Sequence, residues 1–268
     1  MKLHILDISK RKTGEINLPM QFDEVIRTDL IKRAVLALQS SNRQPYGSMK
    51  EAGKRSSSIV SKRRRKYRGM YGFGISRTPR KVLSRRGTRM YWVGAFAPNT
   101  VGGRRAHPPK SEKIIVKKLN KKERKKAIRI CISATLIGDL VKNRGHIIPE
   151  DYPFVIDTKF EDLSKTTDVI QALKAFGLEK ELERAHKKKV RSGKGKSRGR
   201  KYKTAKGPLI VVSKKGKLMK AADNIPGIDV VNVKEINAEL LAPGNTPGRL
   251  TLWTTGAIET LEKEKLFR

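Results

Sequence analysis

The residues of this sequence that could support catalysis are few and lie far apart. Asp157, Glu161 and Asp162 follow an apolar run, where carboxylates can bind Mg²⁺ or act as a general base, although helix capping or solvation is the commoner role of such a cluster. Ser213 ends another apolar run but lacks the G-x-S-x-G context of a hydrolase nucleophile. The single cysteine, Cys131, lies in an apolar helical pattern that predicts a core residue. These residues form no catalytic constellation, so we predict that the chain is not an enzyme.

Glycine-rich segments of the sequence do not match a nucleotide-binding fingerprint. Gly195-Lys196-Ser197 looks like the end of a P-loop, but the first glycine of that motif would fall on Val190, in a basic segment. The glycines between Gly69 and Gly74 follow no predicted strand and lack the spacing of a dinucleotide-binding turn. The histidines are too far apart in sequence to form a metal-ligand motif: His4, His107, His146 and His186. We therefore expect no metal and no cofactor.

The chemistry that the sequence does support is neutralisation of a polyanion. The chain has 268 residues and a formal net charge of +37, and between Arg43 and Lys110 it holds 19 Lys and Arg against one acid, Glu51. Apolar residues there follow no sustained helical or alternating period, so the segment has little to bury. A second basic stretch, residues 187–206, holds 11 Lys and Arg and no acid. We predict that residues 43–110 form an extended loop that becomes ordered when it binds a polyanion.

Rings and glycines among these cations favour RNA as the polyanion. Tyr67, Tyr71 and Trp92 are expected to stack on unpaired bases, a contact worth about 1–3 kcal/mol per base, while the cations meet phosphates. Irregularly spaced glycines and prolines suit folded RNA better than the regular major groove of DNA. A solvated basic tail with no defined path is the alternative interpretation.

The residues predicted to contact RNA combine the cations of both segments with the rings beside them. They are Arg43, Tyr46, Lys54, Arg55, Arg63, Arg64, Arg65, Lys66, Tyr67, Arg68, Tyr71, Arg77, Arg80, Lys81, Arg85, Arg86, Arg89, Trp92, Arg104, Arg105, His107, Lys110, Arg198, Arg200, Lys201, Tyr202 and Lys203. For any one of these cations, exposure to water without an RNA contact is the competing expectation.

The remaining residues, 1–42 and 111–268, have the composition of a globular domain. Short apolar runs alternate with amphipathic patterns, which predicts right-handed βαβ units. The fold class we expect is α/β, with a mainly parallel sheet covered by helices. Residues 43–110 would be a long basic loop inserted after the first main helix, and residues 187–206 a second basic loop within the domain.

Several elements can be placed from local signals. Two strands are expected around a turn at Thr13-Gly14, followed by a helix that Thr28 or Asp29 caps. A capping box formed by Asn120 and Glu123 should begin a buried helix that continues to about residue 141. Further strands are expected at 153–157, 208–213, 229–233 and 250–253, and helices at 169–176, 178–185, 218–224, 235–241 and 256–265.

Five blocks of sequence match a known family in order and over nearly the whole chain. They are RQPYG (Arg43–Gly47), AGKRSSS (Ala52–Ser58), GGRRAHPPK (Gly102–Lys110), RGRKY (Arg198–Tyr202) and LAPGNTPGRLTLW (Leu241–Trp253). With these blocks the chain resembles the large-subunit ribosomal protein four (L-four) family in its archaeal and eukaryotic-like form.

The resemblance implies a structural protein of the large ribosomal subunit whose long loop reaches inward through ribosomal RNA and lines part of the nascent-peptide exit tunnel. Residues 43–54 and 102–110 would form the stem of this loop. Its tip would comprise Gly74, Ile75, Ser76, Arg77, Thr78, Pro79, Arg80 and Lys81. The implied partners are large-subunit ribosomal RNA, neighbouring large-subunit proteins and the nascent peptide near the tip, with no membrane and no homo-oligomer.

The sequence also bears on location and on a competing function. The start of the chain lacks the apolar region of a signal peptide and no 18-residue apolar run is present, so we expect a soluble protein of the cytoplasmic ribosome. The alternative left open is a free regulator that binds a messenger RNA, for example its own, through the same loop. An RNA-modifying enzyme would require a glycine-rich turn after a strand, which we do not find.

Overall fold

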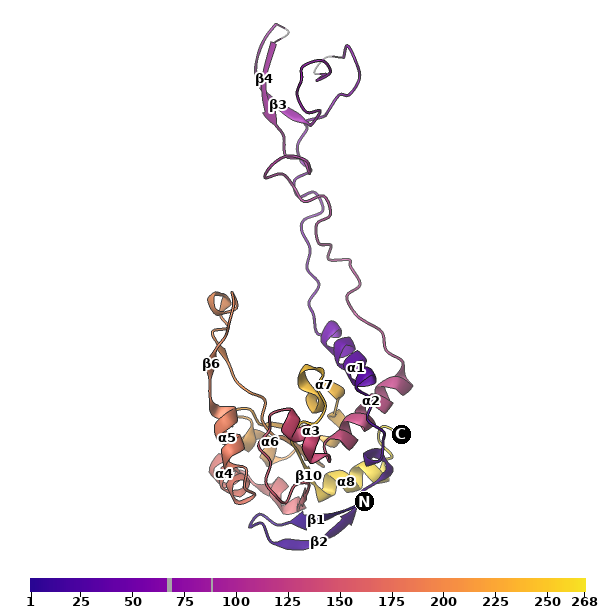
Figure 1. The fold of residues 1–268 in the computed structure, drawn as a ribbon, viewed down its shortest axis with the longest axis vertical. Helices are drawn as coiled ribbons and strands as arrows, with labels where there is room; N and C mark the ends of the chain where they lie inside the picture. Colours follow the sequence, from indigo (N-terminus) through magenta and orange to yellow (C-terminus); the bar gives the residue numbers. More distant parts are fainter. Residues whose placement is uncertain (67–68, 88) are drawn as a thin grey trace. The chain divides into compact units, whose positions relative to one another are not determined.

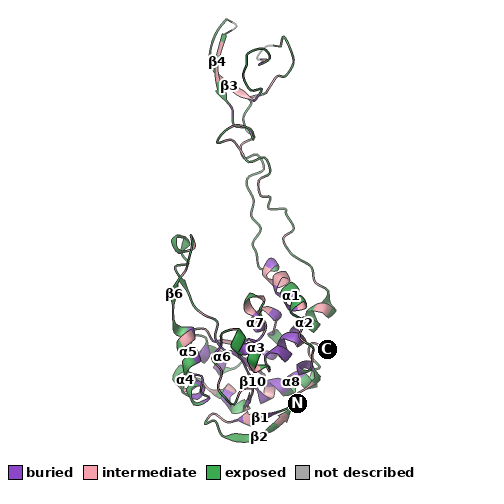
Figure 2. Ribbon diagram, in the orientation of Figure 1, coloured by how far each residue is buried: buried purple, intermediate pink, exposed green. Residues whose placement is uncertain are grey.

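The computed structural model describes residues 1–66, 69–87 and 89–268. They form two compact units: residues 1–42 with 116–268, here called the body, and residues 43–115, here called the arm. Figure 1 follows the chain through both units. Buried residues are concentrated in the body, whereas most of the arm is exposed (Figure 2).

The body is built on a six-stranded sheet with the order β2-β1-β5-β10-β8-β9. β1 pairs antiparallel with β2, and the other pairings in this sheet are parallel. The strands are β1 (Lys2–Leu6), β2 (Lys12–Asn17), β5 (Val155–Ile156), β8 (Leu209–Val212), β9 (Asp229–Asn232) and β10 (Thr251–Thr254). This confirms the predicted α/β class with a mainly parallel sheet.

The two faces of the sheet bury separate apolar layers. Along β8, Leu209 and Val211 belong to one layer, and Ile210 and Val212 to the other. Helices that contribute to the first layer are α1 (Thr28–Ser41), α2 (Lys121–Ala134), α7 (Ala238–Leu241) and α8 (Thr255–Lys263). Those that contribute to the second are α3 (Gly138–Asn143), α4 (Thr166–Ala175), α5 (Glu179–His186) and α6 (Lys217–Ala222). Because both faces are covered, the interior strands β5 and β8 are continuous apolar runs.

The predicted side-chain caps do not form at either long helix of the first layer, although Asn120 is the N-cap residue of α2, where that helix was expected to begin. Neither Thr28 nor Asp29 caps α1, because the N-cap residue is Arg27, whose Nη2 lies 2.7 Å from Asp29 Oδ2. The capping box of α2 does not form: Asn120 makes no side-chain cap hydrogen bond, and Glu123 Oε1 instead accepts from Arg33 of α1 at 3.1 Å. An ion pair between two helices thus uses the carboxylate that local sequence assigned to a cap.

The buried helix predicted to continue to about residue 141 is instead divided into α2 and α3. At the break, Thr135 Oγ1 donates to the carbonyl of Ile132 at 2.7 Å. The hydroxyl of Tyr152 donates to the carbonyl of Thr135, which gives that carbonyl a partner outside the helix. A tertiary hydrogen bond therefore helps to end α2, and the apolar pattern alone does not record it.

The first chain reversal also lies elsewhere than predicted. Thr13-Gly14 is inside β2, and the turn is formed before it, where the N–H of Lys10 donates to the carbonyl of Asp7 at 2.8 Å. The N–H of Asp7 donates in turn to the carbonyl of Arg11 at 2.9 Å. Lys10 adopts a φ of +62°, so the left-handed position is taken by a residue that gives no glycine signal.

The arm contains a β-hairpin that the sequence analysis did not predict. β3 (Arg80–Arg86) pairs antiparallel with β4 (Arg89–Gly94). The register shifts between Val82 and Ser84, which interrupts the alternation of side chains along β3. This irregularity explains why the segment showed no strand periodicity.

Candidate nucleic-acid interface

The two ends of the arm run side by side. The N–H of Ser48 donates to the carbonyl of Pro109 at 3.1 Å. Beside it, a Cβ on Gly47 would lie 2.4 Å from the backbone nitrogen of Ser111, so only glycine permits this approach. These contacts join the segments that the resemblance assigns to the stem.

A tight turn precedes Arg104 and Arg105 of the GGRRAHPPK block. The N–H of Thr100 donates to the carbonyl of Ala97 at 3.2 Å, and the N–H of Gly103 to the carbonyl of Thr100 at 2.8 Å. A Cβ on Gly103 would lie only 1.8 Å from the Ala97 carbonyl oxygen. The glycine is therefore a steric requirement of the turn that leads into Arg104 and Arg105.

Most of the predicted RNA-binding residues of the arm are exposed. Arg80, Trp92 and Arg104 are half-buried, and Tyr67 and Arg68 lie outside the described residues. The exposed ones are Arg43, Tyr46, Lys54, Arg55, Arg63, Arg64, Arg65, Lys66, Tyr71, Arg77, Lys81, Arg85, Arg86, Arg89, Arg105, His107 and Lys110. The arm thus presents its cations to solvent.

The residues predicted for the tip of the arm differ in their exposure to solvent, and one ring predicted to stack on a base has a cation beside it. Gly74 to Arg77 are exposed, whereas Thr78 is buried within the arm and Arg80 begins β3. The ring of Tyr71 has the Arg64 guanidinium carbon 4.9 Å from its centroid, a cation–π contact.

Acids of the arm leave its positive charge largely uncompensated. Glu51 Oε2 lies 3.7 Å from Arg55 Nε, and Glu112 Oε1 lies 3.2 Å from Lys50 Nζ. All four side chains are exposed, so each pair contributes at most about 1 kcal/mol. Phosphates of a bound polyanion can displace such acids at small cost.

The second basic loop is a two-stranded ladder rather than an irregular segment. β6 (Lys189–Val190) pairs antiparallel with β7 (Tyr202–Lys203). Arg191 extends the ladder, since its N–H donates to the carbonyl of Lys201 at 2.8 Å and its Nε to the carbonyl of Arg200 at 3.1 Å. All five predicted residues of the loop are exposed: Arg198, Arg200, Lys201, Tyr202 and Lys203. Among the described residues, none of the four cations in this set, Arg198, Arg200, Lys201 and Lys203, forms an ion pair with an acid, whereas Lys206 at the end of the loop does.

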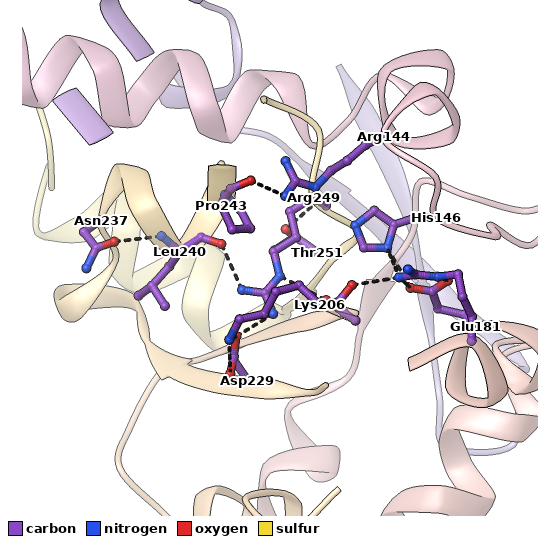
Figure 3. A network of polar contacts seen from close by, with 12 residues as sticks. Arg144, His146, Glu181, Lys206, Asp229, Asn237, Leu240, Pro243, Arg249 and Thr251 are labelled. Carbon is purple, nitrogen blue, oxygen red and sulfur yellow. Dashed lines mark hydrogen bonds and ion pairs between the residues drawn. The ribbon is translucent and has the colours of Figure 1, made fainter. Parts of the chain in front are cut away.

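A buried ion pair fixes the C-terminal end of this loop to the body (Figure 3). Arg249 is fully buried, and its Nη2 lies 2.6 Å from Asp229 Oδ2. Its Nε donates to the carbonyl of Gly207 at 3.0 Å. Asp229 Oδ2 also lies 3.0 Å from Lys206 Nζ. The ion pair between Arg249 and Asp229 therefore holds both Lys206, the last residue of the loop, and Gly207, which follows it.

A second buried cluster fixes the helix that leads into the loop. Glu181 of α5 is fully buried and accepts hydrogen bonds from Arg184 Nη2 at 2.6 Å and from the Ile147 N–H at 3.0 Å. His146 Nδ1 lies 2.6 Å from the same carboxylate, and Arg184 Nη2 also donates to the carbonyl of Lys206 at 2.7 Å. Burial raises the pKa of Glu181, but the hydrogen bonds from Arg184 and His146 outweigh burial and hold it below its usual range. Burial lowers the pKa of His146, which favours the neutral form of its ring.

Sequence reasoning missed both clusters. Their members come from segments far apart in the chain, and the only local signal is Arg249, a lone cation within the block before the apolar strand β10.

The acidic cluster after β5 is divided: Asp162 is exposed, as expected of a solvated residue, whereas Glu161 is a hydrogen-bond acceptor within the body. Glu161 accepts hydrogen bonds from the Ser213 N–H at 2.9 Å, from Ser213 Oγ at 2.7 Å and from Thr254 Oγ1 at 2.5 Å. Asp157 precedes a 3₁₀ turn without a side-chain cap. Ser213 and Thr254 lie at the carboxyl ends of β8 and β10, where open α/β sheets bind ligands. Glu161 thus binds the donors that a phosphate would otherwise use.

Other candidates for chemistry are excluded by their environment. Cys131 is buried, and burial raises its pKa to about 12, which confirms a core role. Gly195-Lys196-Ser197 lies in the exposed loop, where Lys196–Arg198 form one 3₁₀ turn instead of the helix that follows a P-loop. The described residues contain no group of three or more His, Cys, Asp or Glu able to hold a metal ion.

Of the helices in the part of the chain that is described, none is long and apolar enough to cross a membrane.

The fold and the interface define a class of protein: an α/β domain with two exposed basic segments suited to a polyanion and, among its described residues, no constellation for catalysis. The chain belongs to the ribosomal protein L4/L1 family, whose model matches residues 16–264. This confirms the family inferred from the five sequence blocks. Since the family is structural, it also confirms that the chain is not an enzyme.

Relatives match the chain along its whole length. A protein of Nanoarchaeum equitans named large ribosomal subunit protein uL4 is 52% identical over 268 residues, covering 100% of each chain. Proteins of the same name are 46% identical over 260 residues in Methanococcoides burtonii (97% of each chain) and 44% identical over 262 residues in Archaeoglobus fulgidus (97% of this chain and 98% of the relative).

Proposed function

We propose that this protein is a structural constituent of the large subunit of the cytoplasmic ribosome and binds large-subunit ribosomal RNA through its arm and its loop 187–206. The observation that carries the proposal is the exposure of cations in these segments. Among the described residues of loop 187–206 only Lys206 pairs with an acid, Asp229, and the arm has only weak surface pairs. Membership of the ribosomal protein L4/L1 family supports ribosomal RNA as the polyanion that these cations bind.

Binding would replace counterions with side chains. Arg and Lys of the arm lie between RNA helices that otherwise repel one another, and rings such as Trp92 fill gaps beside unstacked bases. The arm has few buried apolar residues, so RNA contacts supply the free energy that orders it. Loop 187–206 is held by the body at both ends and loses less entropy on binding.

The finer assignments rest on the resemblance. Residues 43–110 act as the RNA-binding loop, and the segment from Gly74 to Lys81 lines the nascent-peptide exit tunnel and meets the nascent peptide. The globular domain expected from the sequence, residues 1–42 and 111–268, contacts neighbouring ribosomal proteins. We expect no homo-oligomer.

Sedimentation tests the proposal. A tagged full-length chain is recovered from native lysate after a high-salt wash and run on a density gradient, and trypsin cleavage of the arm is compared across fractions. We expect the chain in the large-subunit fractions, with the arm protected there and cleaved in the free protein. Recovery in light fractions alone, with the arm still cleavable, would reject the ribosomal role and favour the messenger-RNA regulator.

A further inference from the structure

A cavity of about 480 Å³ lies within the arm, between the β-hairpin and the AGKRSSS block. Its lining includes the hydroxyl run Ser56–Ser58, the indole of Trp92 and three cations, Arg55, Arg80 and Lys81, but no acid. The volume falls in the range of about 300–1,000 Å³ that is usual for small-ligand sites.

The hairpin places the ring and one guanidinium together. Trp92 pairs with Val82, and Arg80 precedes Val82 by two positions, so these three side chains lie on one face of the hairpin. Arg80 Nη2 donates to the carbonyl of Ser76 at 3.1 Å, which orients the guanidinium. Arg80 Nε is buried and has no hydrogen-bond partner among the described residues. Buried donors of this kind are normally paired, which points to an acceptor supplied from outside the chain.

We propose that this cavity binds a single nucleotide unstacked from the bound RNA, with its base on the ring of Trp92 and its phosphate between Arg80 and Arg55. The inference rests on the proposed RNA-binding function and deepens it by naming the RNA unit and the residues that receive it.

The chemistry of the lining favours a nucleotide over other ligands. A nucleotide carries a flat ring and a phosphate in one unit, which matches a half-buried indole beside guanidinium forks. Arg55 is free to engage a phosphate, because its acidic neighbour Glu51 is an exposed partner at 3.7 Å. The hydroxyls of Ser56–Ser58 can donate to the ribose or to base edges.

Tyr91 supplies a matched control for Trp92. It is the adjacent residue of β4, so its side chain lies on the opposite face of the hairpin, and it does not line the cavity. Its ring has the guanidinium carbon of Arg89 5.3 Å from its centroid. Tyr91→Ala therefore removes a ring of similar size from the same strand without changing the cavity.

The first experiment measures affinity of the full-length chain for transcribed large-subunit ribosomal RNA. Losing one base stack should make Trp92→Ala bind about 5- to 150-fold more weakly than wild type. Trp92→Phe keeps a ring face and should bind within about threefold of wild type, and Tyr91→Ala within about twofold. Arg80→Gln should reduce the slope of log K against log salt by about 0.7, the value for one contact to a single strand.

The second measurement distinguishes stacking from a folding effect. The chain has two tryptophans, and the other one, Trp253, is buried in the body against Phe22 with ring centroids 5.0 Å apart. The difference in emission between wild type and Trp92→Phe therefore reports on Trp92 alone. We expect RNA to quench this difference signal.

The outcomes separate the two proposals. If wild type binds the RNA tightly but Trp92→Ala matches Tyr91→Ala and Trp92 emission is not quenched, the nucleotide site is refuted and the ribosomal role stands. If wild type binds ribosomal RNA no better than unrelated RNA of equal length, both proposals are refuted.

Discussion

The ion pair between Asp229 and Arg249 gives the sharpest stability prediction. Arg249 is fully buried, with Nη2 2.6 Å from Asp229 Oδ2, and it also donates to the carbonyls of Gly207 and Leu240 at 3.0 and 2.9 Å. Asp229→Asn preserves the shape of the side chain but removes its charge. The guanidinium then stays buried without a counter-charge.

The magnitude follows from burial. Removing one partner of a buried ion pair costs about 3–5 kcal/mol. The Asp229 side chain is itself 29% exposed, so we expect the lower end, a loss of about 3 kcal/mol in the free energy of unfolding. The double variant Asp229→Asn/Arg249→Met also removes the uncompensated cation and should regain about half of this loss.

Urea unfolding followed by far-UV circular dichroism at pH 7 measures these changes. Glu259→Gln is the control, because the Glu259–Lys263 pair has a similar distance of 3.0 Å but is exposed, and its loss should cost less than about 0.5 kcal/mol. The reasoning fails if Asp229→Asn is no more destabilising than this control, or if the double variant is no more stable than Asp229→Asn. Trypsin should also cleave loop 187–206 of Asp229→Asn sooner than that of wild type.

Three further predictions concern pH, the second loop and the arm. Burial depresses the pKa of His146, so the unfolded chain takes up a proton at higher pH than the folded chain does. The free energy of unfolding should therefore fall as pH drops below about 6.5, by at most about 1.4 kcal/mol per pH unit. Unfolding measured at pH 7, 6 and 5 should show a smaller decrease for His146→Asn than for wild type. Changing Arg198, Arg200 and Lys203 together to serine should lower the slope of log K against log salt for ribosomal RNA binding by about 2 to 3, as measured by filter binding. As a control, serine replaces three lysines of the body that pair with acids, Lys215, Lys234 and Lys263, and the slope should then be unchanged. Gly103→Ala would place a Cβ 1.8 Å from a carbonyl oxygen and force the turn open, so trypsin should cut the arm of the RNA-bound variant faster than that of RNA-bound wild type, and equal rates would contradict the geometry.

The sequence predicted the secondary structure of the body best where consecutive residues of a segment are buried, because such a segment is visible as an apolar run. The run Leu209–Val212 is fully apolar and forms the interior strand β8, because both sheet faces are covered. Prediction failed where a distant residue decided the local structure. The hydroxyl of Tyr152 donates to the carbonyl of Thr135, where α2 ends. Arg33 of α1 donates to Glu123, which the local sequence had assigned to a capping box. The hairpin of the arm was missed because a register shift hides its alternation.

The sequence alone determined which segments carry the charge and which polyanion they suit, because composition and the five motif blocks are local properties of the chain. Only the tertiary structure decided which cations are buried. Arg249 and Arg198 are the same residue type, yet one is enclosed beside Asp229 and the other is exposed. Burial depends on contacts between segments that are distant in sequence, as when Glu181 meets His146, and no local spacing records such contacts.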